Sequence, residues 1–132
     1  MAISVNTATV PRKDRSGRTP FCKFFSSDNL SGCEQIMTLP EGHSGIYLKS
    51  IVIGSAVSLT VSIGDGETSN DLTTTVLGPI TLNRDVGTPA NHVAPAAIFH
   101  HTFDKELLFS TNLSIDASAA GAVWGVVEGF SI

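Results

Sequence analysis

Most of the chain alternates between apolar and polar residues with a period of two, which is the pattern of half-buried β-strands and not of helices. In VSLTVSI, at residues 57–63, the apolar side chains fall on one side and the hydroxyl side chains on the other. NLSIDASA at 112–119 repeats this pattern, whereas GIYLKSIVIG at 45–54 is mostly apolar on both sides, as expected of a strand that is covered on both faces. We expect the core to contain Val57, Leu59, Val61, Ile63, Leu113, Ile115 and Trp124.

Further strands are predicted where the same period recurs between turn-forming residues. They are EQIMTL at 34–39, TTTVLGPITL at 73–82, AAIFHHTF at 96–103, ELLFST at 106–111 and GAVWGVVEGFSI at 121–132. About eight short strands separated by Gly, Pro, Asn and Asp predict an all-β fold, a jelly-roll-like β-sandwich with an extended N-terminal arm. Residues 83–95 are expected to form one long loop.

The size and composition of the chain favour one domain that works in an assembly. A length of 132 residues is enough for a single core, and only 15% of the residues are charged, against about a quarter in an average protein. We therefore predict an arm at residues 1–25 and one β-sandwich domain at 26–132. The low charge and the strands that are apolar on both sides also predict self-association, with a homotrimer favoured and a homodimer as the alternative.

Positive charge is concentrated near the N-terminus although the chain carries a net charge of −4. Residues 1–23 carry +4 and residues 24–132 carry −8. A basic arm on an acidic body suggests attachment to an acidic surface or a sheet edge of another protein, with cations steering and phenylalanines anchoring. The predicted binding residues are Arg12, Lys13, Arg15, Arg18, Phe21, Lys23, Phe24 and Phe25.

Two other interpretations of the arm stay open. A solvated, partly disordered arm is the simpler alternative for any run of charges. Nucleic acid is a less favoured partner because the acidic body would repel phosphate, so that only the arm could make the contact.

The search for chemistry yields no catalytic site and no cofactor. GHSG at 42–45 departs from the spacing of a nucleophile elbow and is better interpreted as a surface turn. His100 and His101 are adjacent, so on a strand they point to opposite sides and cannot share one metal ion without distortion. In GDGETSND, at 64–71, a polar turn is favoured over a cation site, although oxygen ligands are offered by Asp65, Glu67, Asn70 and Asp71.

The two cysteines, Cys22 and Cys33, lack CxxC spacing, and we expect them to be reduced. No run approaches the ~18 apolar residues of a membrane-spanning helix, and the first residues lack the features of a signal peptide. The sequence therefore predicts synthesis in the cytoplasm and no membrane partner.

Three segments carry a resemblance to a known group of proteins. They are IYLKSIVIGSAVSLTVSIGDG at 46–66, VLGPITLNRDVG at 76–87 and AVWGVVEGFSI at 122–132. Their turn placement, with a strand pair on a Gly-Ser turn, a Gly-Pro strand and a final Gly-spaced aromatic strand, resembles small structural proteins of tailed bacteriophages over residues 45–132.

The resemblance implies a non-enzymatic virion protein. Its first implication is a capsid decoration, or cement, protein that binds the major capsid protein on the outer surface of the head. Its second is a tail or fibre domain that binds host-surface glycans. Apart from the resemblance, a cupin-like enzyme is a further class to consider. It would need a metal-binding set of histidine and glutamate residues, and HHTFDKE at 100–106 does not have that spacing.

Overall fold

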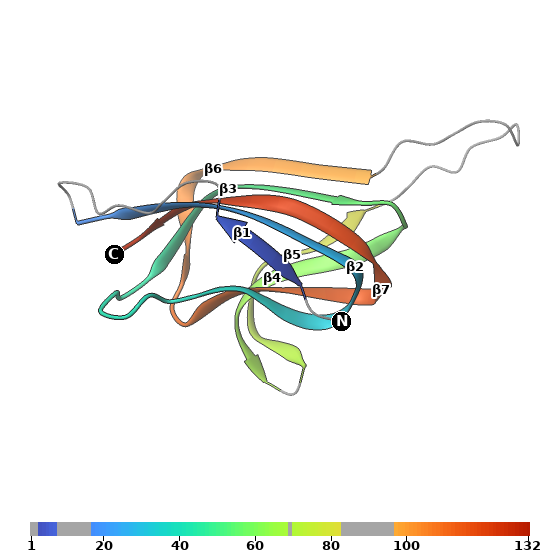
Figure 1. Cartoon of the computed structure of the whole chain (residues 1–132), viewed down its shortest axis with the longest axis horizontal. Coiled ribbons are helices and arrows are strands. Elements are labelled where there is room, and N and C mark those ends of the chain that lie inside the picture. The colour runs from blue at the N-terminus through green and yellow to red at the C-terminus, as the bar shows by residue number, and fades with distance from the viewer. Residues whose placement is uncertain (1–2, 8–16, 69, 83–96) are drawn as a thin grey trace, which may run out of the picture.

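The computed structural model describes residues 3–7, 17–68, 70–82 and 97–132 (Figure 1). The described residues form antiparallel strands and no helix, which confirms the all-β prediction. The strands are β1 (Ser4–Thr7), β2 (Thr19–Thr38), β3 (Ile46–Ser55), β4 (Leu59–Thr68), β5 (Asp71–Leu82), β6 (Ala97–Phe109) and β7 (Asn112–Ser131). Since there is no helix among these residues, none of their segments is a helical membrane span.

The three main strand pairs are nested in the sequence, because β2 pairs with β7, β3 with β6 and β4 with β5. The two 20-residue strands β2 and β7 run through both layers of the sandwich. In what we call the first layer, residues 19–27 of β2 and 123–131 of β7 lie beside β1, β3 and β6. In the second layer, residues 32–38 of β2 and 112–117 of β7 lie beside β4 and β5.

Long strands can serve two layers only if they bend, and β2 contains the irregularities that permit a bend. Its register with β7 shifts between Ser27 and Leu30, between Leu30 and Gly32, and again between Gln35 and Met37. Gly32 adopts a φ of 76°, a left-handed conformation that glycine tolerates at little cost. The extra residue belongs to β2 at the first and third of these shifts, whereas the second shift has its extra residues in β7. Extra residues in one strand bend it and increase its twist, so both long strands can change layer in this region.

The described residues form seven strands where the sequence predicts about eight, and β6 shows one reason. The predicted strands at 96–103 and 106–111 join into a single β6 (Ala97–Phe109). In the pairing with β3, Thr102 lies opposite Ser50 and Leu107 opposite Leu48, so residues 103–106 form a bulge. The predicted loop at 83–95 lies outside the described residues.

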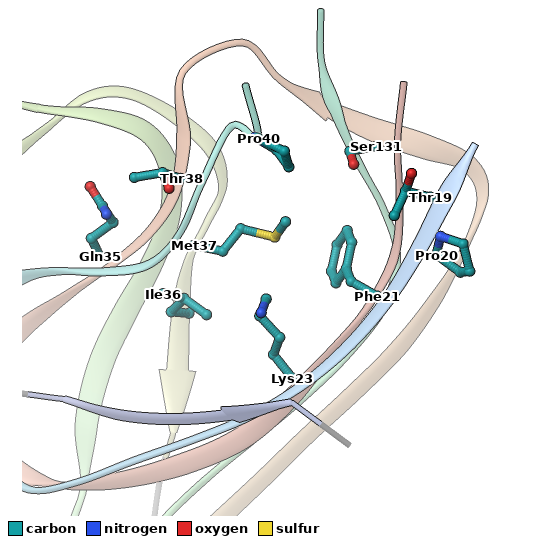
Figure 2. A pocket seen from close by; sticks show the side chains of 10 residues that line it. All are labelled: Thr19, Pro20, Phe21, Lys23, Gln35, Ile36, Met37, Thr38, Pro40 and Ser131. Atoms are coloured by element: carbon teal, nitrogen blue, oxygen red, sulfur yellow. The ribbon is translucent and has the colours of Figure 1, made fainter. Parts of the chain in front are cut away.

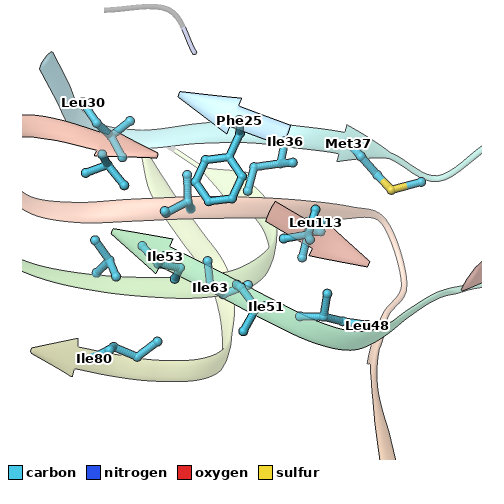
Figure 3. Packing of buried hydrophobic residues seen from close by; sticks show 14 of the residues in the cluster. Phe25, Leu30, Ile36, Met37, Leu48, Ile51, Ile53, Ile63, Ile80 and Leu113 are labelled. Carbon is cyan, nitrogen blue, oxygen red and sulfur yellow. The ribbon is translucent and has the colours of Figure 1, made fainter. Parts of the chain in front are cut away.

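The core lies between the two layers (Figure 3). Five of the seven residues predicted for the core are buried, namely Leu59, Val61, Ile63, Leu113 and Ile115. The predictions for Val57 and Trp124 are wrong, because these side chains are 41% and 38% exposed. Val57 lies in the turn between β3 and β4, where the strand alternation no longer applies.

Trp124 points to the solvent side of the first layer, where it lies against Gly54 of β3. A Cβ atom at position 54 would lie 2.5 Å from the indole Nε1, so only glycine allows this close approach. Because Gly54 has no side chain, the Trp124 indole packs directly against the backbone of β3.

The N-terminal segment also departs from the prediction. β1 pairs with Ser26 to Lys23 of β2 at the edge of the first layer, and β2 itself begins at Thr19. The predicted boundary after residue 25 thus falls inside β2 and needs correction. The physical reason is that the period of two continues through Phe21, Lys23 and Phe25, which places this segment in the sheet.

Candidate functional site

The solvent side of the first layer forms a surface that we call the outer face. Residues directly opposite in antiparallel strands point to the same side of the sheet, so the register defines its members. One row crosses the layer from Asn6 through Phe24, Val126 and Val52 to His100. On one side of it the next row contains Ser26, Trp124, Gly54 and Ile98. On the other side a polar row of Cys22, Glu128, Ser50 and Thr102 comes first, followed by Pro20, Phe130, Tyr47 and Leu108.

The outer face collects most of the exposed large apolar side chains in the described part of the chain. Phe24 is 47% exposed, Trp124 38%, Ile98 66% and Leu108 47%, and only two further residues belong to this class. Between Phe24 and Trp124 the surface forms a shallow hollow of about 260 Å³. Large apolar side chains that are exposed together on one face are typical of an interaction site. The outer face is therefore our candidate functional site.

Charged residues border one end of the outer face. Phe130 is stacked on Tyr47 with ring centres 5.0 Å apart, and the guanidinium carbon of Arg18 lies 4.3 Å from the centre of the Phe130 ring. A pocket of about 330 Å³ beside this stack is lined by Arg18, Lys49 and Glu128. We call these three residues the charged corner. Together with the Tyr47–Phe130 stack, the charged corner places charges of both signs beside an aromatic surface, a composition suited to contact with a protein.

The predicted arm residues that the structure describes lie in four places, the last of which is the hydrophobic core. Arg18 belongs to the charged corner, and Phe24 belongs to the outer face. Lys23 lines a different pocket, between the two halves of β2 (Figure 2). Arg12, Lys13 and Arg15 lie outside the described residues.

The prediction that Phe21 and Phe25 anchor a partner needs correction. They are only 4% and 2% exposed and belong to the hydrophobic core. Both lie on the inward side of β2, while Phe24 lies on the outward side, so neighbouring phenylalanines have opposite roles. Alternation along a strand is the physical reason.

The polar segment at 64–71 is engaged within the fold. The Asp65 carboxylate accepts hydrogen bonds from the backbone N–H groups of Ser110, Thr111 and Asn112 at 2.7, 2.8 and 3.1 Å. Asn70 accepts a hydrogen bond from the Cys33 N–H at 3.2 Å. Within the described residues, no group of three His, Cys, Asp or Glu side chains could hold a metal ion, and the Glu67 side chain is not described. The hydrogen bonds of Asp65 and Asn70 thus hold two of the four oxygen-bearing side chains within the fold.

Three smaller predictions are confirmed. GHSG lies at a turn in which the His43 N–H donates to the Pro40 carbonyl at 3.0 Å. His100 lies on the outer face, whereas His101 lies between Phe99 and Phe103, with ring centres 6.3 and 4.7 Å away.

The third confirmed prediction concerns the thiols of the two cysteines. Cys22 is half-buried, Cys33 is buried, and no disulfide joins them.

Comparison with protein-family models, with curated proteins and with solved structures finds no match for this chain. The outer face therefore has to be interpreted from its own geometry. Sequence reasoning named only Phe24 of this face as a binding residue, although a further signal was present. Residues 122–127, AVWGVV, carry apolar residues at consecutive positions, so both sides of a strand there must be apolar.

One carboxylate on the second layer yields a test of stability against pH. Burial raises the pKa of Asp116 above its ordinary value, and the nearby Asp71 carboxylate raises it further. Because the pKa is raised in the folded state, the protonated carboxyl of Asp116 favours folding. This contribution is complete below the unfolded pKa of about 3.9 and is lost as pH rises through the folded pKa. At neutral pH the ionised side chain therefore costs stability.

We expect Asp116→Asn to increase the free energy of unfolding at pH 7 by about 0.2 to 1 kcal/mol, a small gain because the side chain is partly exposed. Urea denaturation from pH 3 to pH 7 measures it, and the gain should disappear toward pH 3. Asp104→Asn, at an exposed position of the β6 bulge, is the control and should change little. A gain that is the same at pH 3 and pH 7 would contradict the electrostatic explanation.

Proposed function

We propose that this protein is a non-enzymatic structural subunit of a virus particle, a capsid decoration protein on the outer surface of a tailed-phage head. The observation that carries the proposal is the outer face. A sheet surface with Phe24, Trp124, Ile98 and Leu108 exposed on one side is suited to being covered by another subunit. The low charge of the chain and its resemblance to phage structural proteins favour the same function.

Within this proposal, the outer face packs against another copy of the chain. Symmetric oligomers bury the same kind of apolar patch on each subunit, and many identical contacts add up across a lattice. We favour a homotrimer because a trimer matches a three-fold position of a capsid, with a homodimer as the alternative.

Attachment to the particle is assigned to the basic residues that precede and begin β2. Arg18 is placed at the charged corner, and Arg12, Lys13 and Arg15 precede it in the sequence. The partner would be an acidic patch of the major capsid protein. The charge of −8 on residues 24–132 disfavours packaged nucleic acid as the partner.

Replacement of Arg12, Lys13, Arg15 and Arg18 with Ser tests this attachment. Each exposed ion pair contributes about 0.2 to 1 kcal/mol, so four together correspond to about 0.8 to 4 kcal/mol, and we expect a roughly four-fold or larger loss of affinity for particles. Binding of the unmodified protein should also weaken as salt rises, because salt screens exposed charges. Co-sedimentation with capsids at increasing ionic strength measures both effects.

Lys105→Ser is the control for that experiment, since Lys105 is an exposed cation in the β6 bulge. It should bind particles as the unmodified protein does. Unchanged binding of the quadruple variant to both empty and DNA-filled capsids would overturn the attachment proposal. A loss confined to DNA-filled particles would instead identify nucleic acid as the partner.

One observation favours the second candidate function, a tail or fibre domain that binds glycans. The exposed Trp124 indole borders a hollow that also has Asn6 and Ser26 in its lining. An exposed aromatic ring beside polar side chains can stack on a sugar ring and hydrogen-bond to its hydroxyls. Binding of the isolated protein to host-cell glycans, lost in Trp124→Ala, would support this candidate over the decoration protein.

A further inference from the structure

We propose that the outer-face contact between copies of this chain is sensitive to pH, because a second copy covers the uncharged imidazole of His100 and is released when this side chain takes up a proton. The inference rests on the self-association proposed above and adds the regulation of that contact.

His100 lies at the β6 end of an apolar row of the outer face. Its register partner on β3 is Val52, and the row continues through Val126 to Phe24. The side chain is exposed, and its imidazole makes no hydrogen bond, ion pair or ring contact with the described residues. A copy that covers both of the exposed side chains Phe24 and Ile98 therefore also covers His100.

The side chains next to His100 on the outer face carry no charge. Val52 lies directly opposite on β3, and the remaining neighbours are Ser50 and Gly54 of β3 and Ile98 and Thr102 of β6. A proton on His100 would therefore place a positive charge among apolar and hydroxyl groups.

The charged residues of the surrounding strands lie farther from His100. Those of β6, at 104–106, belong to the bulge farther along the strand. β5 approaches β6 from the second layer and carries one ionisable residue, Asp71. The rows of the outer face hold one carboxylate, Glu128, which lies two strands away on β7 and lines a pocket together with Lys49. Among the described residues, none of these carboxylates is placed to neutralise an imidazolium at His100.

The cost of covering His100 depends on its charge. A neutral imidazole can be covered at modest cost, whereas an imidazolium that loses its hydration without gaining a partner costs far more. Histidine is the side chain that changes charge between about pH 5 and 8. Because the contact accepts the unprotonated form, association is strongest at the higher pH and is lost as pH falls.

His101 provides a control within the same strand. It projects to the other side of the sheet, where its ring lies between Phe99 and Phe103. A second copy on the outer face does not contact that side, so protonation of His101 should leave the association constant unchanged.

Sedimentation equilibrium of the full chain at about pH 7.5 and about pH 5.5, at one ionic strength, tests the proposal. We expect the association constant of the unmodified protein to be at least about ten-fold lower at the lower pH. Both pH values leave ordinary carboxylates ionised, and Asp116 lies in the second layer, away from the contact.

Three variants assign the effect to one side chain. His100→Gln, which stays neutral, should associate equally at both pH values to within about three-fold, and His101→Gln should keep the ten-fold loss. His100→Lys, which is charged at both pH values, should associate at least about ten-fold more weakly than the unmodified protein at the higher pH. Far-UV circular dichroism checks that each variant is folded.

The outcomes separate this proposal from the self-association on which it rests. Association that is independent of pH, that grows stronger in acid, or that keeps its pH dependence in His100→Gln would overturn the role of His100 and leave self-association intact. A protein that is monomeric at micromolar concentration at the higher pH would contradict self-association itself, and the role of His100 with it.

Discussion

Replacement of Phe25 with Ala is expected to lower the free energy of unfolding by about 3 to 5 kcal/mol, whereas Phe24→Ala should change it by no more than about 0.5 kcal/mol. Phe25 is 2% exposed and Phe24 is 47% exposed. The Phe25 ring fills space above Gly125 of β7, since a Cβ atom at position 125 would lie 2.6 Å from the ring. Truncation therefore leaves a cavity between the layers (Figure 3).

Urea denaturation of each variant, at a protein concentration too low for association, measures this difference. The pair is a matched control in itself, because the two residues are identical and adjacent and differ only in the side of β2 from which they project. Equal costs for the two variants would mean that Phe25 is not a core residue. Residues 19–25 would then belong to the N-terminal arm, as the sequence predicts.

Replacement of both Phe24 and Trp124 with Ser is expected to weaken self-association at least 100-fold while leaving the domain folded. Both side chains belong to the outer face and lie on adjacent strands. Full burial of an exposed large apolar side chain is worth about 1.5 to 3 kcal/mol, and roughly half of this remains to be gained by each half-exposed ring. In a symmetric contact both copies lose both rings, so four such losses correspond to about 3 kcal/mol or more. Sedimentation equilibrium over a range of concentrations measures the association constant.

Val57→Ser is the matched control for the outer face, since Val57 is 41% exposed in the turn between β3 and β4. It should leave the association constant unchanged. A stable monomer of the unmodified protein at micromolar concentration would contradict the self-association proposal. Equal weakening by the control would show that association is not confined to the outer face.

The sequence alone was sufficient to predict those features of the structure that depend on local alternation and turn chemistry. The period of two at residues 59–63 and 113–117 predicted the burial of the apolar side chains, although Ser114, on the polar side of the pattern, is buried as well. The adjacency of His100 and His101 predicted their opposite orientations. These features depend on neighbours in the chain, and strand geometry links such neighbours directly.

Other features were decided by contacts between distant parts of the chain. Phe21, Phe24 and Phe25 look alike in the sequence, and only their place in β2 makes two of them core and one outer face. Trp124 looks like a core residue until β3 places Gly54 beneath its indole. An alternating pattern distinguishes two sides of a strand without stating which side meets the second layer.

The candidate site shows the same division. Composition and apolar periodicity determined that this chain is an all-β domain with apolar surface to cover. The location of that surface depended on the pairing of β2, β7, β3 and β6, which brings Phe24, Trp124, Ile98 and Leu108 onto one face. These residues are separated by up to 100 positions in the sequence, and only long-range strand pairing decides that they become neighbours.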